Sequence, residues 1–268
     1  MTHVHYIFSS VWREISTGEM TFFTDYAVVN SDTVTHSHTV ALNFHLHRFS
    51  SAQHRWANFA DSHWYLDSMA IKAANGYSVF CRQDFVGIDY GMVDCATYAP
   101  LPDYYSAILW TELMGTTALA ATSTSPSVRA YAHCSPSSGP SSSGPPSGED
   151  GKPTAGDGTA GGGTAGGGVT VLLLNLDNST TRNVTLNGFS AAAPRVEWHL
   201  TGPGGAGSPK MALNGKLLVA KVAGTEYELP SLAGRAVPPS PQAAGPVVVE
   251  MAPASIAFVK LKASGVCA

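Results

Sequence analysis

Residues 135–168 are almost entirely Ser, Gly, Pro, Ala and Thr, and they include two GGG runs on either side of Thr164 and Ala165. Such a stretch cannot bury enough apolar surface to offset the entropy lost on ordering, so we predict a disordered insertion. A phosphate-binding loop would also be rich in glycine, but it needs a Lys-Ser or Lys-Thr pair and a following helix, which are absent here. The rest of the chain must therefore fold around this insertion.

Composition narrows the classes of protein that the 268 residues can form. The length suits one large domain or two small ones, and 44% hydrophobic residues are enough for a core. Charged residues make up only 13% and the net charge is −4, so we expect no basic face for nucleic acid. No run approaches the roughly 18 apolar residues of a membrane span, and residues 1–5 lack the order of a secretory signal.

In residues 56–122 the predicted elements follow in the order helix, strand, loop and helix, which is typical of parallel α/β units. We predict helices over residues 56–74 and 103–114, each ended by a glycine, and strands over residues 77–82 and 118–122. The predicted inward positions are Phe59, His63, Leu66, Ala70 and Ala73 in the first helix and Tyr105, Ile108, Leu109 and Leu113 in the second. In such folds function lies in the loop after a strand, here residues 83–101.

Residues 169–268 alternate between apolar and polar positions and turn repeatedly. Six strands are predicted, over residues 169–176, 181–186, 195–200, 216–220, 247–250 and 256–261. Short strands at this spacing indicate a β-sandwich, and residues 123–134 supply a further strand of it. The insertion therefore interrupts the sandwich, which is tolerable because lengthening a surface loop costs little free energy.

Residues 1–55 have no sustained period, and we treat them as divergent or partly disordered. They contain three His-x-His pairs: His3/His5, His36/His38 and His45/His47. On a strand both members of a pair would point to one face, and two pairs could bind a metal ion. A poorly ordered, histidine-rich segment explains the same residues, so we expect no native metal site and no cofactor.

Several strings resemble one family, the heparanase-like glycoside hydrolases of plant type. The strings are FADSHWYLD (59–67), VFCRQ (79–83), GIDYG (87–91), LPDYY (101–105), RAYAHC (129–134), VTVLLLNL (169–176), LNG (213–215) and PSL (230–232). The resemblance covers residues 56–134 and 169–268. It implies the C-terminal portion of a (β/α)8 barrel, ending near residue 122, followed by a β-sandwich.

The resemblance also implies an activity, retaining cleavage of β-glucuronide bonds. This reaction needs an acid/base carboxylate and a nucleophilic carboxylate about 5 Å apart. No residue of this chain corresponds to the acid/base, so the site is expected to be incomplete. The family's nucleophile lies in a Trp-x-Gly-Glu context, which VWREIS (11–16) approaches, so Glu14 is the candidate and Glu19 the alternative. Residues 1–55 could instead be foreign to the family.

Substrate-binding residues follow from the resemblance at the end of the last barrel strand. Gln83 ends that strand, and Tyr90 together with N–H groups near Gly87 would hold the carboxylate of a uronic acid in a glycan substrate. Tyr90 could equally pack against the barrel mouth. Asp89 stands where the family has a neutral residue and would repel a carboxylate, whereas Asp94 is expected to be a solvated loop acid.

Four cysteines are present, and their spacing matches no zinc pattern. Cys134 ends the first sandwich strand and Cys267 follows the last, and first and last strands of a sandwich are commonly neighbours. Heparanase-like proteins have cysteines at both places, so a disulfide between Cys134 and Cys267 is expected. Cys81 should be an inert buried thiol, and Cys95 has no evident partner.

Two N-glycosylation sequons begin at Asn178 and Asn183. Together with widely spaced cysteines they favour a secretory route, and the resemblance implies a secreted, lysosomal, vacuolar or membrane-associated extracellular protein. Two alternatives to a hydrolase stay open. The chain could be a non-catalytic carbohydrate-binding or structural β-sandwich, or a pseudo-enzyme that has lost half of its barrel.

Overall fold

The computed structural model describes residues 4–14, 20–30, 57–77, 79–80, 85–87, 91–136, 168–223, 226–239, 245–263 and 265–267. The chain separates into two compact units, Met1–Ser50 and Ser51–Ala268. In the first unit, β1 (Val4–Glu14) pairs antiparallel with β2 (Met20–Asn30) along its whole length. The larger second unit holds the remaining described elements.

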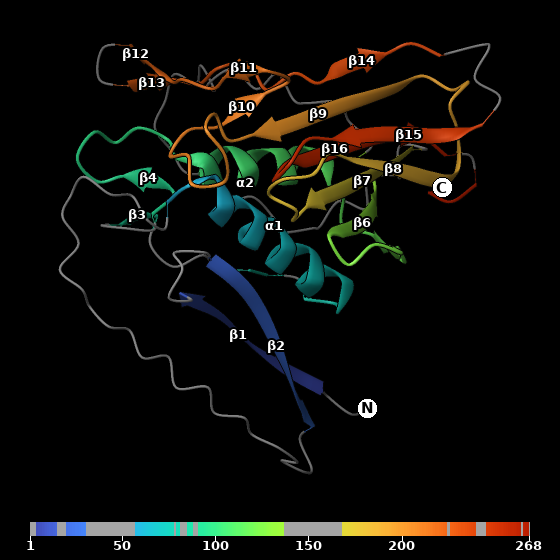
Figure 1. Ribbon diagram of the computed structural model, residues 1–268, viewed down its shortest axis with the longest axis horizontal. Coiled ribbons are helices and arrows are strands. Elements are labelled where there is room, and N and C mark those ends of the chain that lie inside the picture. Colours follow the sequence, from blue (N-terminus) through green and yellow to red (C-terminus); the bar gives the residue numbers. More distant parts are fainter. Residues whose placement is uncertain are drawn as a thin grey trace, which may run out of the picture. The chain divides into compact units, whose positions relative to one another are not determined.

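An eight-stranded antiparallel sheet forms the centre of the second unit (Figure 1). Its order is β11-β10-β9-β16-β7-β6-β5, and β14 also pairs with β9. The strands are β5 (Ala118–Leu119), β6 (Val128–Cys134), β7 (Gly168–Asn175), β9 (Arg195–Thr201), β10 (Ala212–Leu213), β11 (Lys216–Leu217), β14 (Arg235–Val237) and β16 (Ile256–Lys262). Strand β8 (Arg182–Ser190) pairs with β15 (Pro246–Met251) in a separate sheet, and β12 (Lys221–Ala223) with β13 (Glu226–Glu228).

Both faces of the central sheet are covered, which explains why every residue of β7 is buried. Leu172 and Leu174 join a core that includes residues of both helices. Val171 and Leu173 point the other way, into an aliphatic core shared with β8 and β15. The central sheet thus lies between two layers, the β8–β15 sheet on one face and a layer of helices on the other.

Two helices make up that layer, α1 (Phe59–Ala74) and α2 (Pro102–Leu113). The side chain of Asn58 caps α1 by accepting from the N–H of Ala60 at 3.0 Å. The N–H groups of Phe59 and Ala60 also donate to the backbone carbonyls of residues 208 and 206, respectively. Gly76 ends the helix with φ of +81°. Between the helices, Ser62 Oγ donates to Asp103 Oδ1 at 2.9 Å.

The two predicted helices and most predicted strands are confirmed, with ends shifted by a few residues. The inward positions are mostly confirmed too, since Phe59, His63, Leu66 and Ala70 are buried in α1 and Tyr105, Leu109 and Leu113 in α2, although Ala73 and Ile108 are half-buried. The strand predicted over residues 216–220 is only the two-residue β11. The patterns did not predict β10, β12, β13 or β14, which are two or three residues long.

The buried barrel strand predicted over residues 77–82 is wrong for its described part. Tyr77, Val79 and Phe80 are not in a strand, and Val79 is 72% exposed. A parallel strand needs a neighbour on each side for its backbone hydrogen bonds, and none of the described strands pairs with this segment. Residues 118–122 were likewise expected to continue an α/β unit, but β5 pairs antiparallel with β6 at the edge of the central sheet.

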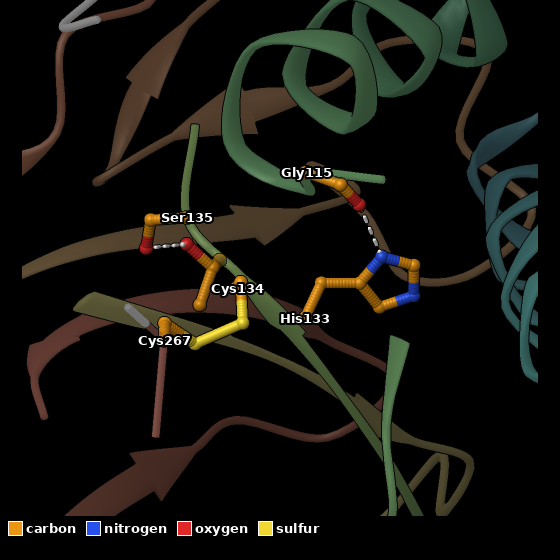
Figure 2. Close-up of a disulfide and its surroundings, with 6 residues drawn as sticks. Gly115, His133, Cys134, Ser135 and Cys267 are labelled. Carbon is orange, nitrogen blue, oxygen red and sulfur yellow. Dashed lines mark hydrogen bonds between the residues drawn. A yellow bond between two sulfur atoms is a disulfide. The ribbon is translucent and has the colours of Figure 1, made fainter. Parts of the chain in front are cut away.

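The ends of the Gly/Ser/Pro-rich insertion meet in this sheet. Ser135 N donates to the carbonyl of Gly168 at 2.9 Å, and the hydroxyls of Ser135 and Thr170 lie 2.9 Å apart. Beside them, Cys134 and Cys267 form the expected disulfide, with their Cα atoms 5.6 Å apart (Figure 2). The insertion is therefore the connection of a β6–β7 hairpin. Residues 137–167, predicted to be disordered, lie outside the described residues.

Candidate active site

The residues expected to carry catalysis and substrate binding are described only in part. Glu14 is the last residue of β1, opposite Met20 in β2, and its side chain lies outside the described residues. Gln83 and Tyr90 also lie outside them, as do Glu19 and Asp89. The backbone of Gly87 is the one described part of the predicted carboxylate-binding group.

Gly87 belongs to β3 (Val86–Gly87), which pairs in parallel with β4 (Val93–Asp94). In this register Gly87 lies opposite Asp94. The pair therefore brings the start of the expected substrate-binding loop, at residue 87, against its later part. Each of these strands has only two residues, and the described residues between them include no helix, so the pair is not one of the predicted α/β units.

Asp94 is buried, with 8% of its surface exposed, so the expectation of a solvated acid is wrong. Its Oδ1 accepts from the N–H of Ala96 at 2.9 Å, the N–H of Thr97 at 2.6 Å and the hydroxyl of Thr97 at 2.8 Å. An Asp side chain that bonds the backbone two and three residues on stabilises a turn. Asp94 thus holds the loop beside Gly87 in shape, and its spacing to Thr97 could have signalled this.

Hydrogen bonds also connect this loop to β13 and to the residue directly before α2. The hydroxyl of Tyr227, on β13, donates to the carbonyl of Thr97. On the other side, the N–H of Leu101 donates to the carbonyl of Met92 at 2.9 Å, directly before α2 begins with Pro102. Cys95, in the middle of this turn, is an exposed free thiol, as expected from its lack of a partner. Cys81 lies outside the described residues.

A half-buried carboxylate that the sequence did not point to is Asp67 on α1. It accepts from the hydroxyl of Tyr131, and its Oδ1 lies 3.5 Å from Arg129 Nε, both on β6. Burial raises the pKa of Asp67, and the bonds from Tyr131 and Arg129 only partly oppose this effect. A raised pKa suits a general acid. Both partners, however, lie on β6, so Asp67 has the geometry of a structural contact that holds α1 against the sheet.

Two buried histidines also lie where helices meet the sheet. Burial lowers the pKa of His63 to about 4, and its Nδ1 lies 3.3 Å from the carbonyl of Phe59. The ring of His133 contacts Trp110 edge-on, and its Nδ1 lies 2.6 Å from the carbonyl of Gly115 (Figure 2). Burial lowers the pKa of His133 as well. Both imidazoles are therefore neutral packing groups.

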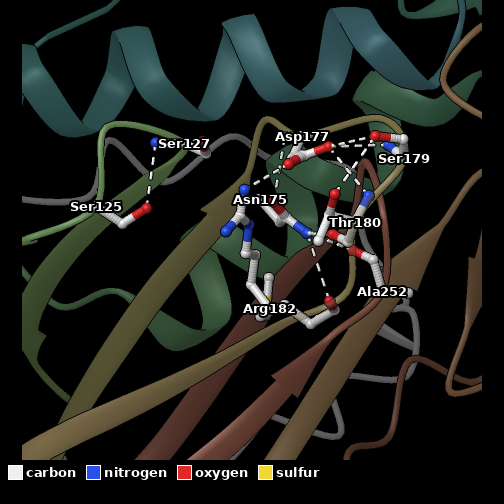
Figure 3. A network of polar contacts seen from close by, with 9 residues as sticks. Ser125, Ser127, Asn175, Asp177, Ser179, Thr180, Arg182 and Ala252 are labelled. Atoms are coloured by element: carbon white, nitrogen blue, oxygen red, sulfur yellow. Dashed lines mark hydrogen bonds and ion pairs between the residues drawn. The ribbon is translucent and has the colours of Figure 1, made fainter.

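The first sequon sits in a tightly bonded turn between β7 and β8 (Figure 3). Asp177 accepts from the N–H groups of Ser179 and Thr180, each at 3.0 Å, and from Arg182 Nη2 at 2.6 Å. Asn175, fully buried, donates from Nδ2 to the carbonyl of Ala252 at 2.7 Å and so ties this turn to the one before β16. The glycosylation candidates Asn178 and Asn183 are both exposed.

Among the residues that the structure describes there is neither a metal-binding cluster nor a membrane-spanning helix. Within the described ranges, no group of three or more His, Cys, Asp or Glu side chains is placed to hold a metal ion. The three His-x-His pairs fall outside those ranges or, for His5, in a strand whose side chains are not described. Neither helix that the structure describes is long and apolar enough to cross a membrane.

The amino-acid sequence is similar to several plant proteins. It is 47% identical over 87 residues to heparanase-like protein 1 of Arabidopsis thaliana, a match that covers 32% of this chain and 16% of that protein. It is 31% identical over 187 residues to heparanase-like protein 3 of the same plant, covering 60% and 30% of the two chains. Baicalin-beta-D-glucuronidase of Scutellaria baicalensis is 31% identical over 155 residues, covering 57% and 24%.

The resemblance to heparanase-like glycoside hydrolases is confirmed. The matched region spans less than a third of each of these relatives, and no family model matches the chain. Among solved structures, the glucanase-xylanase CelM2 from a metagenome library has a TM-score of 0.43 with 16% identity, covering 78% of this chain and 29% of CelM2. A score this low does not establish a shared fold. The heparanase-like resemblance therefore stands on the sequence matches.

Proposed function

We propose that this chain is the C-terminal part of a heparanase-like glycosidase that cleaves β-glucuronide bonds with retention of configuration. The observation that carries the proposal is the sequence similarity to heparanase-like proteins and to a β-D-glucuronidase. The substrate would be a polysaccharide or glycoconjugate that contains uronic acid. On this proposal α1 and α2 are helices from the end of a (β/α)8 barrel, although the strand expected between them is absent at Tyr77, Val79 and Phe80.

The catalytic step needs two carboxylates about 5 Å apart. Glu14 is the proposed nucleophile, which attacks the anomeric carbon and forms a covalent glycosyl-enzyme. The acid/base, which protonates the leaving oxygen and then activates water, would come from a barrel segment that this chain does not supply. The 268 residues alone are therefore proposed to be inactive.

Substrate recognition would lie at the loop that follows Gln83. Tyr90 and the N–H groups near Gly87 would bind the uronate carboxylate, and Asp94 would hold the loop beside Gly87 through its three hydrogen bonds to residues 96 and 97. Asp94 has a positioning role here and does not itself touch the sugar. A hydrogen-bonding site of this kind would distinguish a glucuronide from a glucoside through the carboxylate.

Hydrolysis of p-nitrophenyl β-glucuronide tests the proposal. The chain joined to the coding region upstream of it should release p-nitrophenol, Glu14→Gln in that protein should abolish release, and the 268-residue chain alone should release none. Release by the chain alone that is lost on Glu14→Gln would contradict the incomplete site. Equal hydrolysis of p-nitrophenyl β-glucoside would contradict recognition of the carboxylate.

A second function is favoured by one observation, the coverage of both faces of the central sheet. A disulfide also closes the sandwich, so it has the features of a stable module. Such a module could bind carbohydrate or serve a structural role without catalysis, as in a pseudo-enzyme. Failure of the extended protein to hydrolyse any aryl glycoside while it still binds glycan would favour this alternative.

The proposed cellular route is secretory. The disulfide requires an oxidising compartment, and the exposed Asn178 and Asn183 are proposed N-glycosylation sites, so a secreted, lysosomal or vacuolar protein is the consistent choice. Expression of the extended gene in plant cells should yield protein that loses mass on treatment with an N-glycosidase. Unchanged mass would contradict the glycosylation proposal without bearing on hydrolysis.

A further inference from the structure

Four charged or ionisable side chains gather on one face of the central sheet, on β9 and the neighbouring strand β14. Arg195, Glu197 and His199 alternate along β9, whereas Trp198 and Leu200 between and beyond them belong to the helix-facing core. The charged side chains therefore point away from the helices. A neighbouring strand, β14, places Arg235 directly opposite Glu197 in register.

Glu197 is the centre of this cluster, and its side chain is only 4% exposed. Its Oε1 accepts from Arg195 Nε at 2.7 Å, and its Oε2 lies 2.7 Å from Arg235 Nη2 and 2.9 Å from His199 Nε2. Asn214 fixes the strand at this point, because its Oδ1 accepts from the N–H of His199 at 3.0 Å. The two guanidinium groups are thus held in place by one shared carboxylate.

The charges of the cluster do not cancel. Burial opposes ionisation of Glu197, but the hydrogen bonds from His199, Arg235 and Arg195 outweigh it and lower the pKa of Glu197 to about 2. One carboxylate faces two guanidinium groups, which leaves a positive charge on a protein of net charge −4. The side chain of Arg235 is 60% exposed, so this charge is accessible to a ligand.

A guanidinium has five N–H donors in a planar fork that matches the two oxygens of a carboxylate or sulfate. Glu197 uses Nε of Arg195 and Nη2 of Arg235, so other nitrogens of both groups remain for a second anion. We propose that Arg195 and Arg235 form an oxyanion subsite on the sandwich, which binds the carboxylate or sulfate group of an extended glycan. Arg235 is the outer contact, and Glu197 is a positioning residue that keeps both forks in place.

This inference rests on the proposed function in one respect, the assumption that the anion is carried by a glycan. The cluster lies on the opposite face of the sheet from the helices that would continue the barrel. A glycan held here would therefore anchor the protein on its polymer through the face of the sheet that points away from α1 and α2. Because the readout below is binding and not hydrolysis of an aryl glucuronide, failure of one proposal is distinguishable from failure of the other.

Isothermal titration calorimetry on the full 268-residue chain provides the test, with three oligosaccharides of equal length. One carries uronic acids without sulfate, one carries sulfate esters without uronic acid, and one is neutral. We expect binding of at least one anionic oligosaccharide, weakened by added NaCl, and no binding of the neutral one. The first two arms decide which anion the site prefers. Absence of binding in both anionic arms would overturn the subsite.

Variants locate the binding. Arg235→Ala should raise the dissociation constant about tenfold or more, because a hydrogen bond to a charged group contributes about that factor to the affinity. Lys221→Ala, which removes the same charge from an exposed position on β12, should change it less than about twofold. The unfolding midpoint of Arg235→Ala checks that the fold persists, as its exposure leads us to expect. Equal affinities for wild type and Arg235→Ala would overturn the assignment.

Discussion

The two faces of the central sheet are held by different means. The face toward β8 and β15 is closed by aliphatic side chains and by the Cys134–Cys267 disulfide. The face toward α1 and α2 contains aromatic rings, methionines and polar groups such as the buried His63 and the half-buried Asp67. The aliphatic contacts and the disulfide of the other face do not titrate, whereas His63 and Asp67 do. The Glu197 cluster also points away from the helices, but its carboxyl has a pKa of about 2 and so stays ionised in mild acid. We therefore expect the two faces to respond differently to mutation and to acid.

Removal of the disulfide should have the largest effect. It joins residues 133 positions apart, and a crosslink over so long a loop stabilises by about 3–5 kcal/mol, mainly by restricting the unfolded chain. Replacement of both Cys134 and Cys267 by Ser should lower the free energy of unfolding by this amount in urea titrations. Cys95→Ser is the control and should have no measurable effect, because this thiol is exposed and free. Equal stability of reduced and oxidised wild type would contradict the prediction.

Leu172 and Leu173 compare the two faces directly. They are neighbours on β7, both fully buried, and they point into the helix-facing and the β8/β15-facing cores respectively. Each change to Ala should cost about 2–5 kcal/mol. We expect Leu173→Ala to lower the free energy of unfolding more than Leu172→Ala does. The disulfide-linked aliphatic core around Leu173 can relax less around the cavity than a layer of two helices can. Denaturant midpoints measure both, and a larger loss for Leu172→Ala would reverse our view of the faces.

Acid should weaken the helix-facing side through His63. Burial lowers its pKa to about 4 in the folded chain, against 6.5 for the ordinary group. The folded state therefore binds this proton less readily than the unfolded state, so stability is complete above pH 6.5 and declines as the pH falls towards 4. The loss should reach roughly 3 kcal/mol.

Unfolding titrations between pH 7 and pH 4 measure this decline. His63→Leu should flatten that part of the pH profile, because it removes the titrating group from the interface. An unchanged slope in His63→Leu would show that other groups cause the decline.

Shortening the insertion should have the smallest effect. Ser135 and Gly168 already meet as hydrogen-bonded neighbours, so a four-residue turn in place of residues 137–167 can close the β6–β7 hairpin. The connection becomes about eight times shorter, and each halving of a loop gains only roughly 0.6 kcal/mol, so stability should rise by about 1–2 kcal/mol. A loss of stability on shortening, seen in thermal melts, would mean that the insertion contributes contacts to the fold.

The candidate site was predicted less completely than the fold. The resemblance led to the loop that contains Gly87, and the structure adds that Asp94 lies opposite it and orders the turn. The spacing of Asp94 to Thr97 could have signalled the turn, but it does not show that the carboxylate is buried opposite Gly87. The Glu197 cluster was also missed, because its partners Arg195 and Arg235 are far apart in sequence and only the pairing of β9 with β14 joins them.

Local pattern determined the elements whose stability depends on their own residues. The helix at residues 56–74 and the strand at residues 256–261 were predicted within about three residues of α1 and β16, because apolar period and stop signals act locally. The segment at residues 77–82 reads as a strand by the same rule, yet Tyr77, Val79 and Phe80 are not in one, because a strand is completed only by neighbours. Which face of each strand meets helices, and which meets β8 and β15, was decided by tertiary packing alone. Apolar periodicity identifies a buried face but carries no information on what covers it.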